Sequence, residues 1–287
     1  MDSGKCPLRC DGNHVSSRRD FLCGSTMLLA GCSFLSGCAT LSWQKVTTAP
    51  SQSTERLDLL PRKIAAIRKA CSISTEVLDR SLKHINPGMT EKDLAELLDL
   101  ETKNLGLTKG TFTIVAFGPN TTEPHHYPTE SKLKQNDTIL IDYWAKCDGY
   151  YSDITRCFAI GAPTDLYMEV YRVVERAQAS AIELIKDGVK VKIIDEAARE
   201  VISTSGYPNY EHPTGHGIGL EIHESPFLNS KSDVKLRTGD VITVEPGVYI
   251  PGKFGIRIED DVLVTETGYE VLTSHCPHEP LLTSHTD

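Results

Sequence analysis

The sequence has no excess of positive charge and no apolar run long enough to cross a membrane as a helix. Its 287 residues include 30 Lys and Arg against 39 Asp and Glu, which gives a formal net charge of -9 at pH 7. Non-specific binding to nucleic acid requires a basic field, so we expect no nucleic-acid partner. The apolar run from Phe21 to Ala30 is much shorter than the roughly 20 residues that a membrane-spanning helix needs.

The main part of the sequence also lacks the cysteine spacing of a metal-binding motif. Five of the nine cysteines lie in the first 38 residues. The others are Cys71, Cys147, Cys157 and Cys276, whose separations match no zinc or redox motif. We expect these four to be free or buried thiols, and a disulfide among them stays open. With 39% hydrophobic and 24% charged residues, the composition is that of a globular protein of one or two domains.

Residues 1–38 have the features of an export signal. Arg18 and Arg19 precede the apolar run, and Ser-Arg-Arg-Asp-Phe-Leu resembles the twin-arginine signal of bacteria. Two stretches resemble a lipoprotein cleavage box; Cys32 fits the apolar run better, and Cys38 is the second candidate for lipidation. We expect an exported, lipid-anchored protein on the periplasmic or cell-surface side, with a flexible tether at 39–55. The alternative is a cytoplasmic protein with an inert leader.

Residues 56–287 contain helical patterns followed by strand patterns, twice. Apolar residues recur at three-to-four spacing within 54–105, where Asn86-Pro87-Gly88 separates two helices and Thr90 is the expected N-cap of the second. A strand is expected at 111–117, and further helices at 165–186 and 193–203. The order of helix, helix, strand, hairpin, helix, helix and further strands predicts an α/β fold with two similar halves.

A β-hairpin is predicted from Ile139 to Arg156, because Asp148-Gly149 is a strong turn signal between β-branched and aromatic flanks. With a two-residue loop, Asp142 pairs with Thr155 and Asp153 with Trp144; with a loop from Lys146 to Gly149, the two aspartates lie opposite each other. Either register places both carboxylates on one face, where like charges repel. Hard oxygen ligands at this spacing suit a divalent cation. The alternative is a solvated hairpin face with two unrelated aspartates.

Further candidate ligands follow the hairpin. His212, His216 and His223 lie within twelve residues with three glycines among them, which is neither a helical nor a core pattern. Glu245 and Glu259 each stand within a run of β-branched residues, where a buried charge needs a partner or a metal. Surface-strand positions are the alternative for both glutamates. A histidine pair, His125 and His126, lies in a loop before the hairpin and is either functional or incidental.

Taken in order, these motifs resemble the pita-bread metallopeptidase family M24, which contains methionine aminopeptidase, aminopeptidase P, prolidase and creatinase. The resemblance extends from about Leu57 to Ser274 and rests on the two aspartates, Gly-His-Gly-Ile-Gly, Val-Glu-Pro-Gly and Ile-Arg-Ile-Glu-Asp. It implies a pita-bread fold, in which two α+β halves related by pseudo-twofold symmetry form a curved antiparallel sheet covered by helices. Residues 56–287 are then the catalytic domain.

The resemblance also implies a role for each candidate. Two divalent ions, with manganese favoured and cobalt or zinc as alternatives, bind to five ligands: Asp142, Asp153, His216, Glu245 and Glu259. Asp153 and Glu259 bridge the two ions, and Glu245 is also the general base. His125 contacts the substrate, His223 hydrogen-bonds the scissile amide, and His212 lies near the residue after the scissile bond. Arg257 orders the site through Asp153 or the substrate.

The pattern Arg257-Ile258-Glu259 favours the aminopeptidase P and prolidase branch, because methionine aminopeptidases have glutamine at the arginine position. The implied activity is hydrolysis of the bond between an N-terminal residue and proline. The alternatives are a methionine-type aminopeptidase and a catalytically inactive peptide-binding module. Only the leader and tether precede the catalytic domain. The choice between dipeptides and longer peptides as substrates therefore stays open, and so does the oligomeric state, for which a homodimer is one possibility. Trp144 replaces a small residue of the family, and it either narrows the pocket or packs beneath it.

Overall fold

The computed structural model describes residues 52–109 and 113–282, within the unit formed by residues 49–287. The predicted export signal, with Cys32 and Cys38, and most of the tether lie outside the described residues. Their assignments stay predictions. Within the described ranges, no helix is both long and apolar enough to cross a bilayer.

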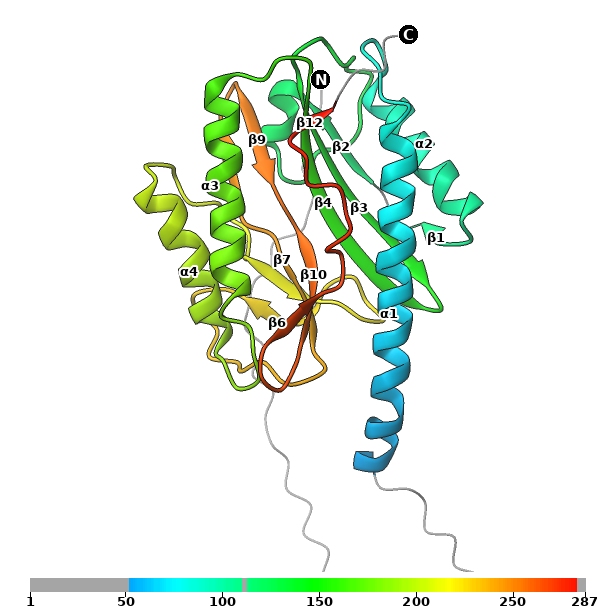
Figure 1. Ribbon diagram of the computed structural model, residues 1–287, viewed down its shortest axis with the longest axis vertical. Helices are drawn as coiled ribbons and strands as arrows, with labels where there is room; N and C mark the ends of the chain where they lie inside the picture. Colours follow the sequence, from blue (N-terminus) through cyan, green and yellow to red (C-terminus); the bar gives the residue numbers. More distant parts are fainter. Residues whose placement is uncertain (1–51, 110–112, 283–287) are drawn as a thin grey trace, which may run out of the picture. The chain divides into compact units, whose positions relative to one another are not determined.

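The chain alternates helices and strands in the predicted order (Figure 1). The helices are α1 (Gln52–Leu82), α2 (Glu91–Asn104), the short 3₁₀ helix η1 (Gly118–Thr122), α3 (Asp165–Ile182) and α4 (Val191–Thr204). The first-half strands are β1 (Thr108–Lys109), β2 (Ile114–Phe117), β3 (Thr138–Cys147) and β4 (Tyr150–Ile160). The later strands are β5 (Gly215–Gly217), β6 (Glu224–Leu228), β7 (Val241–Val244), β8 (Gly247–Ile250), β9 (Phe254–Arg257), β10 (Asp260–Val264), β11 (Tyr269–Val271) and β12 (Leu281–Leu282).

The hairpin of β3 and β4 is built as the shorter-loop register predicts. Asp142 pairs with Thr155 and Trp144 pairs with Asp153, so the alternative with a loop from Lys146 is wrong. Asp148 and Gly149 both have positive φ, 51° and 87°, which is the turn geometry that matches the right-handed twist of paired strands. The two aspartates therefore lie on the same face as diagonal neighbours.

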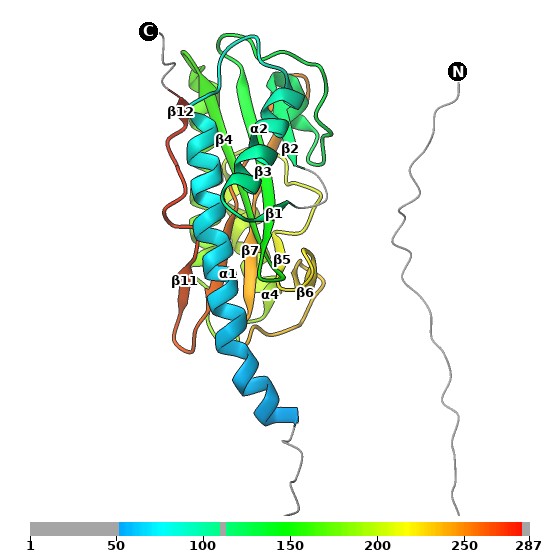
Figure 2. The same ribbon diagram turned by 90° about the vertical axis from the view of Figure 1, so that its right-hand side faces the viewer.

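The alternation of side chains along β3 divides the interior into two cores. Ile139, Ile141 and Tyr143 face α1 and α2, where they pack with Leu94 and Leu98. Leu140 and Trp144, on the opposite face, belong to the core that includes α3 and α4. Figures 1 and 2 show α1 and α2 on one side of the long strands and α3 and α4 on the other. Asp142 shares the second face, so it points into the space between the two halves.

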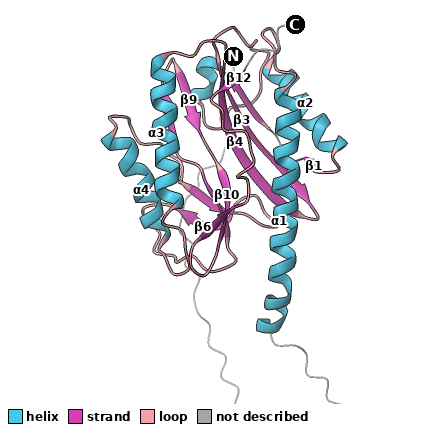
Figure 3. Ribbon diagram, viewed as in Figure 1, coloured by secondary structure: helices cyan, strands magenta, loops and turns pink. Residues whose placement is uncertain are grey.

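The strands of the described residues, drawn in Figure 3, form three sheets. The first has the order β1-β3-β4-β12, with β2 also paired to β3; the second has the order β11-β10-β7-β5-β6; the third is the pair β8-β9. An isolated antiparallel bridge between Thr155 and Glu259 joins β4 to the start of β10. This bridge brings the aspartate hairpin against the strands that carry the predicted glutamates.

The predicted α/β fold with two helix-and-strand halves is confirmed, and the element boundaries differ in detail. Thr90 caps α2 through a capping box with Asp93, as its residue type predicts. The third helix ends at Ile182, earlier than the predicted 186, and the strand predicted at 111–117 is observed from Ile114. The backbone of α1 begins at Gln52, so residues 52–55 of the expected tether are helical. The four described cysteines are free and buried.

Arg156 is a completely buried cation that joins three segments. Its Nη2 donates to Asp260 Oδ1 at 2.6 Å, its Nη1 to the carbonyl of Glu259 at 2.5 Å, and its Nε to the carbonyl of Pro277 at 3.1 Å. Burial alone would lower the pKa of Arg156, but the charge and hydrogen bond of Asp260, together with Cys276 and Tyr171, outweigh it and raise that pKa. The guanidinium stays charged, and removing it would leave Asp260 buried without its counter-ion.

We expect Arg156→Met to reduce the free energy of unfolding by about 3–5 kcal/mol, the usual effect of breaking a buried ion pair. Chemical denaturation measures this loss. Arg80→Met is the matched control, because Arg80 is exposed and its pair with Glu76 contributes at most about 1 kcal/mol. Equal losses for the two variants would contradict the assigned role of Arg156.

Candidate active site

A cavity of about 390 Å³ between the two halves is lined by every residue predicted for catalysis, substrate binding or metal binding. The predicted residues that line it are His125, Asp142, Asp153, His212, His216, His223, Glu245, Arg257 and Glu259. Six of these come from the second half, after α4, and the aspartates come from β3 and β4. The convergence follows from the alternation of β3 and from the bridge between Thr155 and Glu259.

The glycines around His216 allow its strand to lie close to its neighbours. A Cβ added to Gly215 would lie 1.9 Å from the carbonyl oxygen of Thr243, so no other residue fits there. The backbone N–H of His216 donates to Thr243 Oγ1 at 3.1 Å. His216 Nδ1 lies 3.2 Å from the carbonyl oxygen of Gly217, which only accepts, so Nδ1 carries the proton. The lone pair on Nε2 is thereby directed at the carboxylates, as in metal-binding histidines.

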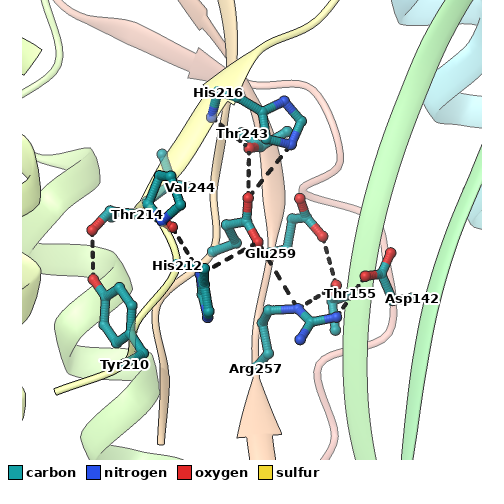
Figure 4. Close-up of polar contacts among 12 residues, drawn as sticks. Asp142, Thr155, Tyr210, His212, Thr214, His216, Thr243, Val244, Arg257 and Glu259 are labelled. Atoms are coloured by element: carbon teal, nitrogen blue, oxygen red, sulfur yellow. Dashed lines mark hydrogen bonds and ion pairs between the residues drawn. The ribbon is translucent and has the colours of Figure 1, made fainter. Parts of the chain in front are cut away.

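Three residues form a group that would hold one metal ion. Ligand atoms of Asp153, His216 and Glu259 all lie within 4.8 Å of one another. His216 Nε2 is 3.7 Å from Asp153 Oδ2 and 3.5 Å from Glu245 Oε1. Thr155 Oγ1 donates to Glu259 Oε2 at 2.5 Å, which fixes that carboxylate. Figure 4 shows His216 above Glu259, with Thr155 beside it.

Burial and mutual repulsion make the ionised state of this cluster unfavourable. Burial, followed by the charges of Glu259 and Asp142, raises the pKa of Asp153 well above its usual value. Burial, followed by the charge of Glu245, does the same to the pKa of Glu259. Burial raises the pKa of Glu245 to about 8, although Arg257 opposes it, and burial lowers the pKa of His216 to about 4. A divalent cation would remove this conflict.

The donor set fits such a cation. Asp142 Oδ1 and Asp153 Oδ1 are both buried and have no hydrogen-bond partner among the described residues. Buried carboxylate oxygens are ordinarily paired, so two orphans on one hairpin face indicate ligands for a metal. Four carboxylates and one imidazole are the donors that manganese, cobalt and zinc accept. Asp142 lies outside the three-residue group, which leaves it with Asp153 as the candidate pair for a second ion.

Arg257 contacts Asp142, and the alternative in which it orders Asp153 is not observed. Its Nη2 donates to Asp142 Oδ2 at 2.5 Å, its Nε to Thr155 Oγ1 at 3.2 Å and its Nη1 to Tyr249 Oη at 3.0 Å. Burial raises the pKa of Asp142, and the charge of Arg257 reduces that rise. Arg257 therefore holds one oxygen of Asp142 and leaves the other free for a metal.

Tyr249, which the sequence did not indicate, connects Arg257 to His212. His212 Nδ1 is 2.8 Å from the carbonyl oxygen of Pro213, which only accepts, so Nδ1 is protonated and Nε2 accepts from Tyr249 Oη at 2.9 Å. Burial lowers the pKa of His212 to about 3, which keeps the ring neutral. No pattern around Tyr249 distinguishes it from an ordinary strand residue.

His125 and His223 are exposed side chains at the mouth of the cavity. The ring of His223 lies edge-on to that of His216, with centroids 4.3 Å apart. Trp144 lines the same cavity and also packs with the core that contains Ile114. Both alternatives for Trp144, narrowing the pocket and packing beneath it, therefore apply.

A buried glutamate of α2, also missed from the sequence, holds the loop that carries His125. Glu91 has no exposed surface and accepts from the backbone N–H of Phe117 at 2.8 Å and of Thr129 at 2.9 Å. His126 Nε2 is 2.9 Å from Glu91 Oε2, and its Nδ1 is 2.9 Å from Glu123 Oε2, so both nitrogens donate. Burial would raise the pKa of Glu91, but these hydrogen bonds outweigh it and lower that pKa.

Comparison with known proteins agrees with this geometry. The sequence matches the profile of Metallopeptidase family M24 over residues 65–266. An uncharacterized peptidase of Staphylococcus aureus is 40% identical over 215 residues, which are 74% of this chain and 61% of that protein. The X-Pro aminopeptidase of Thermotoga maritima has a TM-score of 0.76 at 38% identity, covering 80% of this chain and 66% of the other. The prolidase of Pyrococcus furiosus has a TM-score of 0.72 at 39% identity, covering 74% and 64%.

The fold is that of the pita-bread class, and its cavity is rich in carboxylates. The chain belongs to metallopeptidase family M24, and its structural neighbours are of the aminopeptidase P and prolidase branch. It spans about 61% of the length of the curated relatives that it matches.

We expect Mn²⁺ to release protons when it binds the metal-free protein near pH 7, because carboxyl groups with raised pKa values must first ionise. Titration calorimetry in two buffers of different ionisation enthalpy measures the release, which should decline above pH 8, the pKa of Glu245. Binding heats that do not depend on the buffer would contradict this release.

The same raised pKa makes the stability of the metal-free protein depend on pH. Glu245 keeps its proton in the folded protein up to about pH 8 and loses it near pH 4.5 in the unfolded chain, so the free energy of unfolding should fall as the pH rises from about 4.5 through 8.

We expect Glu91→Gln to loosen the loop from Gly118 to Thr129, because one glutamine amide cannot accept from all of these donors. Hydrogen exchange should accelerate at the amides of Phe117 and Thr129, and the free energy of unfolding should fall by about 2–3 kcal/mol. Glu96→Gln, an exposed change on the same helix, is the matched control. Unchanged exchange at both amides in Glu91→Gln would show that the carboxylate does not hold the loop.

Proposed function

We propose that this protein is a dimetal exopeptidase that hydrolyses the peptide bond between an N-terminal residue and proline. The observation that carries the proposal is the buried cluster of Asp142, Asp153, Glu245 and Glu259 around His216, with two carboxylate oxygens lacking partners. The names of the neighbours, an X-Pro aminopeptidase and a prolidase, support the specificity. The chain is shorter than these neighbours, so the activity is proposed on the residues of its own site.

Asp142, Asp153 and Glu259 would hold one ion, and Asp153, His216, Glu245 and Glu259 would hold the other, with manganese favoured by the excess of oxygen donors. Such ions lower the pKa of a water molecule and polarise a carbonyl group.

The protein side chains have distinct tasks in the reaction. Glu245 accepts a proton from the attacking water as general base and returns it to the leaving nitrogen. His223 and His125, exposed at the cavity mouth, donate hydrogen bonds to the scissile amide and to the bound peptide. Arg257 favours the ionised form of Asp142 and orients it, because its guanidinium donates directly to that carboxylate.

The alternatives have less support. A methionine-type aminopeptidase is disfavoured by Arg257, which is built into the site through Asp142 and Tyr249. A non-catalytic binding module has no need for five potential metal ligands in one cavity, all of which this chain has. The homodimer and the lipid anchor remain predictions from the sequence.

We expect the full chain, with Mn²⁺, to release the first residue from Ala-Pro and Ala-Pro-Ala peptides but not from Met-Ala peptides, and a chelator should abolish release. His223→Ala should lower kcat about 100-fold without loss of bound metal, since a positioned donor to the transition state is removed. His84→Ala, an exposed histidine outside the cavity, is the control. Proline-independent cleavage would favour the methionine-type alternative, and absence of cleavage despite bound metal would favour the binding module.

A further inference from the structure

Two surface segments that the proposed reaction does not use carry an excess of positive charge. Residues 186–192 follow α3 and extend into the first turn of α4, and residues 231–237 precede β7. Together they contain two Asp against six Lys or Arg, whereas the whole chain has a formal net charge of -9. The six cations of this basic region are Lys186, Lys190, Lys192, Lys231, Lys235 and Arg237.

Backbone hydrogen bonds hold the two segments side by side. The N–H of Gly188 donates to the carbonyl of Leu236 at 2.9 Å, and the N–H of Leu236 donates to the carbonyl of Val189 at 2.8 Å. Lys190 and Lys235 form an isolated antiparallel bridge, so they are direct neighbours across the pair. Like charges in this position repel each other. The pairing of the segments therefore concentrates positive charge.

Few acidic groups compensate the charge of the basic region. Asp233 Oδ1 is 2.9 Å from both Lys190 Nζ and Lys192 Nζ, so two ammonium groups share one carboxylate. Asp187 accepts from the backbone N–H and the hydroxyl group of Thr238. The other four cations are exposed, and their side chains form no ion pair with a described residue. Such a surface attracts a partner with several negative charges.

Exposed aliphatic side chains accompany these cations. Leu184, Ile193 and Val234 are exposed, and they lie within or directly beside the two segments. Cations and aliphatic side chains together bind the boundary between lipid headgroups and acyl chains, where both kinds of group contribute. Aliphatic side chains add no such contribution to the binding of a soluble polyanion. The combination favours a lipid surface as the partner.

The basic region lies close to the first turns of α1. A Cβ added to Gly239, in the loop that follows the second segment, would lie 2.7 Å from the side chain of Leu60 in α1. Figures 1 and 2 show α1 beginning at the lower end of the domain. The predicted lipid anchor, Cys32 or Cys38, precedes the start of α1 by no more than 20 residues. A chain of this length spans at most about 70 Å, so the anchor would keep this end of the domain near the bilayer.

We propose that the basic region docks on an anionic phospholipid bilayer, so that a chain anchored at its leader also contacts the membrane through residues 186–192 and 231–237. Each Lys or Arg near such a surface adds an attraction that salt weakens. An anchor combined with a basic patch binds more stably than either alone, because the anchor raises the local concentration of the patch at the membrane. The inference goes beyond the peptidase activity and does not depend on it.

The test is co-sedimentation of the full, Mn²⁺-loaded chain, dialysed free of unbound metal, with phospholipid vesicles. One set is phosphatidylcholine alone, and the other contains about one third phosphatidylglycerol, which supplies the anionic surface. We expect binding to the anionic vesicles that weakens between about 50 and 300 mM NaCl. The combined variant Lys186→Gln, Lys231→Gln and Lys235→Gln should weaken this binding at least about tenfold, because each lost charge removes part of the attraction.

A matched control removes the same charge from exposed positions outside the basic region. It combines Lys103→Gln, Lys132→Gln and Lys253→Gln. This variant should keep the binding of the unaltered chain to anionic vesicles. Chemical denaturation of both variants checks that neither change has unfolded the domain.

The other outcomes overturn the inference. Equal binding to neutral and anionic vesicles would assign the interaction to the apolar run of the leader, which all variants share. Equal losses in the two variants would show that net charge alone decides the binding. Binding to heparin without binding to anionic vesicles would assign the basic region to a soluble polyanion, and absence of binding to both would leave it without an anionic partner.

Discussion

Bringing Asp142, Asp153 and Glu259 together out of water raises the free energy of the ionised form of each one. Their exposed fractions are 8%, 4% and 2%, so water cannot relieve the repulsion. The protein surrounds the cluster with a few fixed compensations, of which Arg257 on Asp142 and Thr155 on Glu259 are the most direct. Among the described residues these leave one oxygen of each aspartate without a partner, which a bound cation would satisfy.

Different segments of the chain hold different residues of the site in place. Arg156 ties the backbone of Glu259 to the C-terminal segment through Pro277, while Gly215 lets the His216 strand approach Thr243. Glu91 holds the loop of His125 by accepting several hydrogen bonds at once. Because each support acts on a different ligand or donor, local changes in one segment can alter one group of the site without displacing the rest.

Local chemistry explains which parts of this architecture were predictable from the sequence. The turn at Asp148-Gly149 and the cap at Thr90 depend on neighbouring residues, and both are formed as predicted. The site residues were identified from short motifs, and the structure brings all of them to one cavity. The partner of Arg257 lies 115 residues away and was wrongly assigned in one alternative, because side-chain pairing across the two halves has no local signal. In the sequence, Glu91 looks like an ordinary acidic residue in the first turn of a helix. Only its complete burial in the structure distinguishes it from such a surface residue.

The strand β12 has a consequence for the order in which this protein can be assembled. It pairs in parallel with β4, next to the aspartate hairpin, and the carbonyl of Pro277 just before it accepts from Arg156. A ribosome makes β4 more than a hundred residues before it makes this partner. The hairpin therefore gains this parallel partner, and Arg156 its contact with Pro277, only after Pro277–Leu282 has emerged from the exit tunnel. Nascent chains that stop short of this segment would present a domain without this strand to chaperones and proteases.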